Sequence, residues 1–279
     1  MKIIKDLLRK TRSKILLLPF IERPLPQNPF KGIKSFKENV YFKLNDEALI
    51  KNDNKKINAF EKENGYLIDP IWFKKLSLQT QTCIKDSPLN FNHGRILYSL
   101  LSRYIVKNNS SPILIFETGT ARGFSSICMA KAIIDRNANG LITTIDSLPH
   151  NEKINWNCIS DCTGKKSREE LLSEWEEELS RIIFIQGWTD NIIDRLGIKR
   201  INFAFLDAQH DKDSVMKEFK FVSDRQMEGD IVVFDDVTKG IFNEVCQAVD
   251  EIEVKFPYEI KRLQIDNKRG YAIATKVYI

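Results

Sequence analysis

The chain has 279 residues, of which 42% are hydrophobic and 29% charged, and its formal net charge is +5 at pH 7. This length predicts one large domain, or one domain with an extension, and this composition excludes wholesale disorder, collagen and a coiled coil. No apolar run reaches the roughly 18–20 residues that a membrane span needs. The five cysteines are scattered and form no Cys-x-x-Cys pair, which indicates free thiols and a cytoplasmic protein.

The basic charge lies near the N-terminus, where residues 1–60 hold 14 Lys and Arg against 6 Asp and Glu. Residues 2–18 alternate basic and apolar side chains, which predicts an amphipathic helix. Such a helix packs on the protein body or on a partner subunit, which is the commoner case, or lies on a membrane surface through residues 2–21. Nucleic-acid binding is not expected, because no aromatic platform accompanies the charge.

Four of the nine prolines fall within residues 19–29 and predict an extended linker. Residues 30–85 are mixed and polar, and their pattern predicts no particular element. We therefore expect residues 1–85 to be an N-terminal extension that covers the active site or mediates homo-oligomerisation, and residues 86–279 to be the main domain.

Within the main domain, short apolar runs alternate with helical segments. Runs without polar alternation are typical of strands buried on both faces, and their alternation with helices predicts a parallel sheet. The expected strands are Ile113–Phe116, Leu141–Ile145, Ile182–Ile185, Ile201–Leu206 and Ile231–Phe234. The expected helices between them are Ser125–Ile134, Asp190–Leu196, Asp213–Gln226 and Phe242–Lys255.

The C-terminal end departs from this alternation. Tyr258–Ile265 and Tyr271–Val277 flank a turn-rich spacer that ends in Gly270, which is a hairpin signal. The sequence thus predicts an α/β protein with a Rossmann-like doubly wound sheet of five parallel strands, a C-terminal antiparallel hairpin and an N-terminal extension. Residues 147–181 form a long connection, which is either a lid or a plain surface insertion. Its second half, Ser167–Arg181, begins with a capping box and predicts a helix.

The strongest chemical signal follows the first strand, where Glu117 precedes a Gly119-x-x-x-Gly123 loop that opens a helix. Glycines let the backbone turn sharply and approach a ligand, and a helix N-terminus favours anionic groups. The spacing does not match the Gly-x-Gly-x-x-Gly dinucleotide fingerprint. Asp146 ends the next strand, where a carboxylate can accept hydrogen bonds from ribose hydroxyls. A tight turn that binds no ligand remains the alternative for the loop.

Together these features resemble the class I S-adenosylmethionine-dependent methyltransferases, over roughly residues 91–279. The resemblance implies that S-adenosylmethionine is the cofactor, that Glu117 approaches its ammonium group and that Asp146 holds its ribose. Trp188 or Thr189 falls where the family contacts the adenine. The cofactor-binding residues that the resemblance implies are Glu117, Gly119, Thr120, Ala121, Gly123, Ser125, Asp146, Trp188, Thr189 and Asp207.

Two further strand ends carry acids: Asp207, with His210 three residues later, and the pair Asp235-Asp236. Three carboxylates brought together repel unless they are protonated or bound to a metal, and oxygen ligands suit Mg²⁺ or another hard divalent cation. The pattern resembles the cation-dependent small-molecule O-methyltransferases of the macrolide-sugar and catechol types. It implies that Asp207, Asp235 and Asp236 bind the metal and that His210 is the general base. Capping networks at the strand ends are the alternative reading.

We therefore expect an S-adenosylmethionine-dependent O-methyltransferase that acts on a hydroxyl of a small molecule, with a sugar-containing metabolite as the preferred acceptor. Three alternatives stay open: a metal-independent methyltransferase, a hydroxylase-like relative of the same fold, and a non-catalytic, membrane-associated subunit that binds the cofactor.

Overall fold

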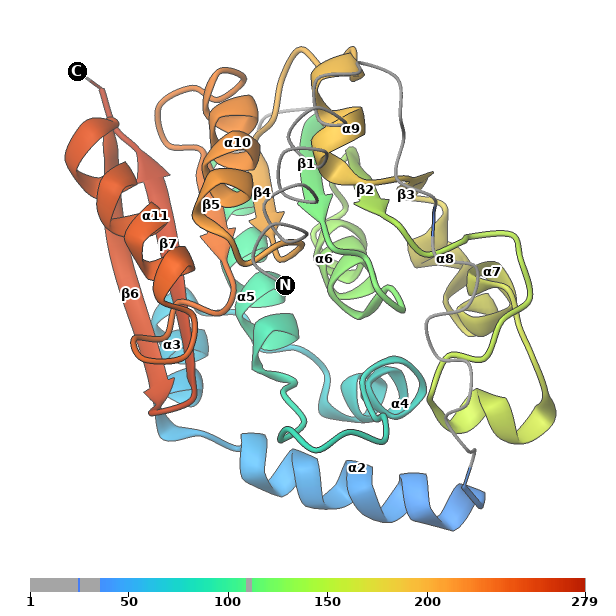
Figure 1. Ribbon diagram of the computed structural model, residues 1–279. Coiled ribbons are helices and arrows are strands. Elements are labelled where there is room, and N and C mark those ends of the chain that lie inside the picture. The colour runs from blue at the N-terminus through green and yellow to red at the C-terminus, as the bar shows by residue number, and fades with distance from the viewer. Residues whose placement is uncertain (1–24, 26–35, 109–111, 279) are drawn as a thin grey trace, which may run out of the picture.

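The computed structural model describes residue 25 and residues 36–108 and 112–278. Its seven strands form one sheet in the order β3-β2-β1-β4-β5-β7-β6 (Figure 1). Neighbouring strands from β3 to β5 pair in parallel, whereas β7 is antiparallel to both β5 and β6. The strands are β1 (Ile113–Thr118), β2 (Gly140–Asp146), β3 (Ile182–Gln186), β4 (Phe203–Leu206), β5 (Ile231–Phe234), β6 (Tyr258–Asp266) and β7 (Arg269–Lys276). The predicted sheet of five parallel strands with a C-terminal hairpin is thereby confirmed.

Helices connect and cover the strands on both faces of the sheet (Figure 1). The four helices predicted between the strands are present. The one that follows the third strand is a short α-helix that continues as a 3-10 helix. The helices of this region are α5 (Asn92–Asn108), α6 (Phe124–Asp135), α9 (Thr189–Ile192), η3 (Ile193–Arg195), α10 (Lys212–Ser223) and α11 (Asn243–Lys255).

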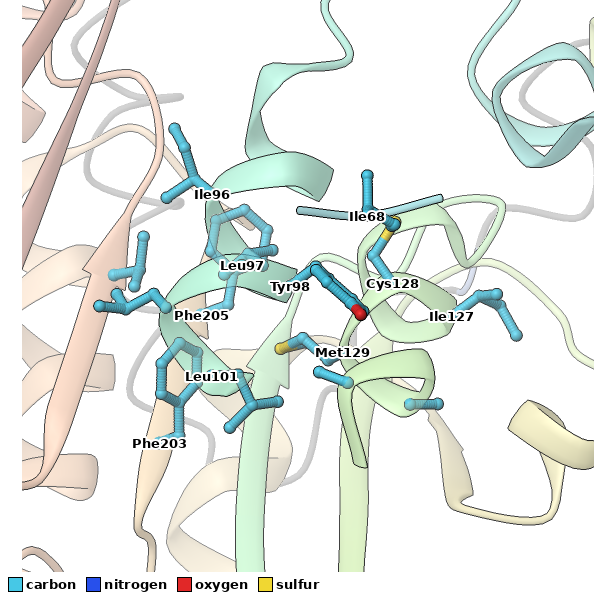
Figure 2. Packing of buried hydrophobic residues seen from close by; sticks show 14 of the residues in the cluster. Ile68, Ile96, Leu97, Tyr98, Leu101, Ile127, Cys128, Met129, Phe203 and Phe205 are labelled. Atoms are coloured by element: carbon cyan, nitrogen blue, oxygen red, sulfur yellow. The ribbon is translucent and has the colours of Figure 1, made fainter. Parts of the chain in front are cut away.

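The buried side chains divide into one cluster on each face of the sheet. On one face, α5 and α6 pack against the strands, and Figure 2 shows Leu97 and Leu101 of α5 beside Phe203 and Phe205 of β4. On the other face, α10 and α11 pack against the strands through residues such as Phe219 and Val249. Because successive strand residues point to opposite faces, a strand such as β4 is fully buried on both sides, which explains its continuous apolar run.

Within residues 36–85, whose elements the sequence did not indicate, the structure describes three helices. They are α2 (Glu38–Asn52), α3 (Lys55–Asn64) and α4 (Pro70–Thr80). Asn54 and Asp69 cap α3 and α4 by accepting backbone N–H groups through their side chains. Apolar residues of these helices, including Phe60 and Leu76, join the same buried cluster as α5 and α6. The predicted amphipathic helix at 2–18 and the linker at 19–29 lie outside the described residues, except for Leu25 within the linker.

The connection between β2 and β3 packs into the body of the protein. It contains η1 (Ile159–Thr163), α7 (Arg168–Leu171), η2 (Ser173–Trp175) and α8 (Glu176–Leu179), and the predicted capping box at Ser167 is present. The predicted continuous helix is interrupted after Leu171. Leu171 packs in a small cluster with Trp156, whereas Leu172 and Trp175 pack in the main core, and one straight helical stripe cannot face both.

In the part of the chain that the structure describes, no helix is long and apolar enough to cross a membrane.

Candidate functional site

The predicted site residues follow the carboxyl ends of β1 to β5. In an open α/β sheet these ends border the ligand crevice. The beginning of β7 meets the same edge, because β7 runs antiparallel to β5, and the backbone N–H of Val237 donates to the carbonyl of Gly270 at 2.9 Å. The turn between β6 and β7 is therefore part of this edge, together with the loops after β4 and β5.

The glycine loop packs directly against the end of β4. Gly119 has a φ of +89°, and a Cβ at this position would lie 2.1 Å from the carbonyl oxygen of Asp207. Gly123 has a φ of +92°, and a Cβ there would lie 2.8 Å from Leu172. Both positions need glycine for its backbone conformation and for the close approach. The loop that is expected to hold the cofactor thus lies in contact with the first predicted metal ligand.

Glu117 is fully buried, and hydroxyl groups hold its carboxylate. Ser125 and Ser126, in the first turn of α6, donate to its two oxygens, and Thr144 of β2 donates at 2.6 Å. Burial raises the pKa of Glu117. These contacts fasten the start of α6 and strand β2 to the glycine loop. Contact between Glu117 and a cofactor ammonium group stays a prediction, as does direct cofactor contact by Ser125.

Asp146 ends β2 as a partly exposed carboxylate. It accepts the backbone N–H of Ala121 at 2.6 Å and that of Leu148 at 2.7 Å. Its remaining lone pairs suit hydroxyl donors such as those of a ribose. Thr120 is buried beside it, with its hydroxyl 2.5 Å from that of Thr144.

The connection between β2 and β3 also supports the glycine loop. Arg168 is 1% exposed, and its guanidinium lies over the rings of Trp156 and Phe184. Its Nε donates to the carbonyl of Ala121 at 3.0 Å. Ala121 itself has a φ of +46°, an uncommon conformation for a residue with a Cβ. The segment that the sequence left open as a lid or a surface insertion is therefore anchored on the loop by the buried guanidinium of Arg168.

The two residues expected near an adenine lie just past β3. Trp188 is partly buried at the N-cap of α9, and Thr189 is buried as the first residue of that helix. Their place at the edge of the sheet agrees with the prediction, and their contact with a cofactor remains a prediction.

The three predicted aspartates gather at the ends of β4 and β5. Burial, followed by the nearby charges of Asp235 and Asp236, raises the pKa of Asp207 well above its usual range. Burial and the charge of Asp236 raise the pKa of Asp235 to about 7. Asp235 also accepts the backbone N–H of Asp236 at 2.7 Å, and Asp236 has a φ of +56°. After burial, the charges of neighbouring carboxylates thus contribute to the raised pKa of Asp207 and of Asp235.

Asp236 is held from both sides. Its Oδ1 accepts from Nη1 of Arg269, and its Oδ2 lies 3.1 Å from Nε2 of His210. The hydrogen bond with Asp236 raises the pKa of His210, whose side chain is 48% exposed. The ring of His210 also lies 5.0 Å from that of Phe242. His210 is therefore oriented by a carboxylate and accessible from solvent, as a general base requires.

Among the described residues, one donor set for a metal ion includes this histidine. Ligand atoms of Asp207, His210 and Asp236 all lie within 4.8 Å of one another. The sequence-based set contained Asp235 in place of His210. Carboxylate oxygens with one imidazole fit a divalent cation, so the residues present can hold one.

Arg269 and His93 lie near this cluster and were not among the predicted site residues. His93, in the first turn of α5, is 6% exposed and lies between the rings of Phe124 and Phe205. Burial lowers its pKa to about 3, so the imidazole is neutral. Arg269 could have been found from the topology, because a strand antiparallel to β5 must begin where β5 ends. His93 carries no comparable sequence signal.

A cavity of about 700 Å³ adjoins the acid cluster through Arg269, which lines it. Its walls come from α2, from the loop before α5 and from the turn between β6 and β7. The polar residues Asn52, Asn90 and Asn92 lie in its lining, and so do apolar residues such as Leu44 and Leu89. Asn92 is 4% exposed, and its Oδ1 has no hydrogen-bond partner among the described residues.

Comparison with known proteins agrees with this geometry. Residues 116–237, which include the glycine loop, Asp146 and all three aspartates, match a family model described as a methyltransferase domain. No curated protein sequence matches the chain.

Among solved structures, the chain is similar to the O-methyltransferase NovP, with a TM-score of 0.53, 13% identity and coverage of 87% of this chain and 100% of that chain. It is also similar to the O-methyltransferase TomG from Streptomyces achromogenes, with a TM-score of 0.51, 17% identity and coverage of 76% and 92%. At these identities the likeness is one of fold. Residues 116–237 thus match a methyltransferase domain, and the chain shares the fold of these solved O-methyltransferases.

Proposed function

We propose that this protein transfers a methyl group from S-adenosylmethionine to a hydroxyl oxygen of a small molecule, assisted by a divalent cation. The observation that carries the proposal is the direct packing of the glycine loop on Asp207, whose ligand atom lies within 4.8 Å of those of His210 and Asp236. A methyl donor held by the loop and a hydroxyl held at the acid cluster would be neighbours. Such positioning is a large source of rate in group transfer.

The cofactor half of the proposal is supported by Asp146 and the glycine loop. Asp146 is a partly exposed carboxylate that suits ribose hydroxyls, and the loop lies between it and Asp207. The similar O-methyltransferase TomG was solved in complex with S-adenosylmethionine. The sulfonium methyl of that cofactor is already activated, so the protein has only to position it and to activate the acceptor oxygen.

In the proposed site, Asp207, Asp235 and Asp236 would hold the cation, and His210 would take the hydroxyl proton at Nδ1, because its Nε2–H donates to Asp236. A divalent cation lowers the pKa of a bound hydroxyl and fixes its direction. Asp236 orients the imidazole of His210 through its Oδ2. His210 cannot ligate the metal and accept the proton with the same nitrogen, so the base role requires Nδ1 to face the acceptor while Nε2–H stays bonded to Asp236.

The cavity beside Arg269 is our proposed acceptor site. Its lining offers amide, ammonium and carboxylate groups together with apolar side chains, which suits the hydroxyls and the C–H faces of a sugar-containing molecule. The unpartnered Oδ1 of Asn92 needs a hydrogen-bond donor, and a hydroxyl supplies one. Residues of α2 form one wall, so part of the N-terminal extension covers this site.

One observation favours a second candidate, a metal-independent methyltransferase. Arg269 already places a positive charge on Asp236. In that case the guanidinium would neutralise the acid cluster, and His210 alone would activate the acceptor.

The experiment that tests the proposal is a methyl-transfer assay with labelled S-adenosylmethionine and a panel of glycosides and catechols. We expect transfer to a hydroxyl, loss of activity when divalent ions are chelated, and recovery when Mg²⁺ or Mn²⁺ is added back. Full activity in chelator would reject metal assistance in favour of the second candidate. Failure to bind S-adenosylhomocysteine in a direct titration would reject the methyltransferase function itself.

A further inference from the structure

Asp236, a proposed metal ligand, has both carboxylate oxygens engaged by other side chains of the protein. Arg269 donates to Oδ1, and Nε2 of His210 lies 3.1 Å from Oδ2. The Asp236 side chain is only 9% exposed, so these contacts, rather than water, surround it. A cation can therefore reach the Asp236 carboxylate only if Arg269 or His210 gives up its contact with it.

Of these two partners, Arg269 is the one whose charge repels a cation at every physiological pH. A guanidinium stays protonated at any physiological pH, whereas a histidine can lose its proton. The Arg269 side chain is 22% exposed, so solvent screens its charge only in part. A divalent ion on Asp236 beside this guanidinium would place like charges a few ångströms apart in a partly buried site, where repulsion is strong.

Arg269 also has space into which it can move. It is the first residue of β7, next to the turn that closes the hairpin (Figure 1). Arg269 lines the cavity of about 700 Å³, together with Asn90 and Lys268. A rotation of the side chain away from Asp236 would keep the guanidinium in this cavity, where water or a bound molecule can solvate it.

We infer that Arg269 is a gate for the metal site: it neutralises Asp236 while no cation is bound, and it must swing into the acceptor cavity before a divalent ion can use that carboxylate. The inference rests on the metal-assisted function proposed above. It has a consequence for specificity, because the displaced guanidinium becomes part of the wall that faces the acceptor. Metal binding and acceptor binding are then coupled through one side chain.

The test is the affinity of the full chain for Mn²⁺. It is obtained from a titration in which electron paramagnetic resonance measures the concentration of free Mn²⁺. In Arg269→Gln and Arg269→Met, which remove the charge, we expect Mn²⁺ to bind about tenfold tighter or more, because no guanidinium has to be displaced. In Arg269→Lys, which keeps the charge, we expect an affinity close to that of the wild type. Asp236→Asn should weaken binding in every background.

Arg262→Gln is the matched control. Arg262 lies on the neighbouring strand β6 and forms ion pairs with Asp250 and Glu253 on the surface, so its removal costs the chain the same charge at a distance from the cluster. We expect its Mn²⁺ affinity to stay within about twofold of wild type, since exposed charges act weakly. Thermal unfolding of each variant verifies that it is folded.

Equal or weaker Mn²⁺ binding in both neutral variants would overturn the gate, and so would equal gains in Arg262→Gln and Arg269→Gln. A parallel titration with S-adenosylhomocysteine separates the gate from the function. If the chain binds that ligand but no variant binds Mn²⁺, the gate is overturned and methyl transfer stands. If the predicted Mn²⁺ pattern appears without cofactor binding, the gate is supported and the methyltransferase proposal falls.

Discussion

Gly119→Ala is expected to lower the free energy of unfolding and to damage the cofactor site. The structure separates the loss of stability into two parts. The first part is the left-handed backbone, with φ of +89°, which costs a residue with a Cβ about 1–2 kcal/mol. The second part is the clash, because the new Cβ would lie 2.1 Å from the Asp207 carbonyl oxygen, an atom of the backbone that cannot rotate away. Overpacking of this kind typically costs a further 1–3 kcal/mol or so.

Gly65→Ala is the control that isolates the clash. Gly65 has a φ of +83° at the end of α3, and a Cβ there would meet no heavy atom within 4 Å, so only the backbone part remains. Urea unfolding should show a loss of about 1–2 kcal/mol for Gly65→Ala. For Gly119→Ala the loss should be about 2–5 kcal/mol in total, with a strong loss of affinity for S-adenosylhomocysteine by calorimetry. Equal losses of stability in the two variants, with cofactor affinity intact in Gly119→Ala, would refute the assignment of this loop.

Two further predictions concern the histidines near the site. His210→Ala should lower turnover by about 10²–10⁴-fold while affinities for S-adenosylhomocysteine and Mn²⁺ stay nearly unchanged, and loss of Mn²⁺ binding would instead make His210 a ligand. Burial holds the pKa of His93 at about 3. Between pH 6.5 and 3 the unfolded chain therefore binds a proton at this residue that the folded protein does not. The free energy of unfolding falls as the pH decreases through this range. His93→Phe removes this contribution, so on going from pH 7.5 to pH 5 it should lose less unfolding free energy than the wild type, by at most about 2 kcal/mol. Identical pH profiles in urea unfolding would contradict that assignment of His93.

The elements of the sheet could be predicted from the sequence because their signals are local. The run Ile231–Phe234 coincides with β5, and the turn-rich spacer before Tyr271 lies at the turn of the hairpin. Parallel pairing then brings all carboxyl ends to one edge, so Asp207 and the pair at 235–236 had to meet there. The same local chemistry identified the glycine loop, since a chain that turns against the end of a strand needs residues without a Cβ.

The helices α2 to α4 could not be predicted with the same certainty. Their buried faces pack against α5, α6 and the β2–β3 connection, and the periodic pattern of apolar residues is weak along α2 and α4. The break after Leu171 has the same origin, because two separate clusters compete for adjacent side chains.

What the sequence determined by itself was the order of strands and helices, the glycine turn and the placing of acids at strand ends, all of which follow from spacing over a few residues. Only the tertiary structure decided which charges touch. The contact between Arg269 and Asp236 joins residues 33 positions apart, and the neutral state of His93 depends on rings contributed by α6 and β4. Electrostatic interactions depend on distance and burial in space, and neither quantity is encoded in local spacing.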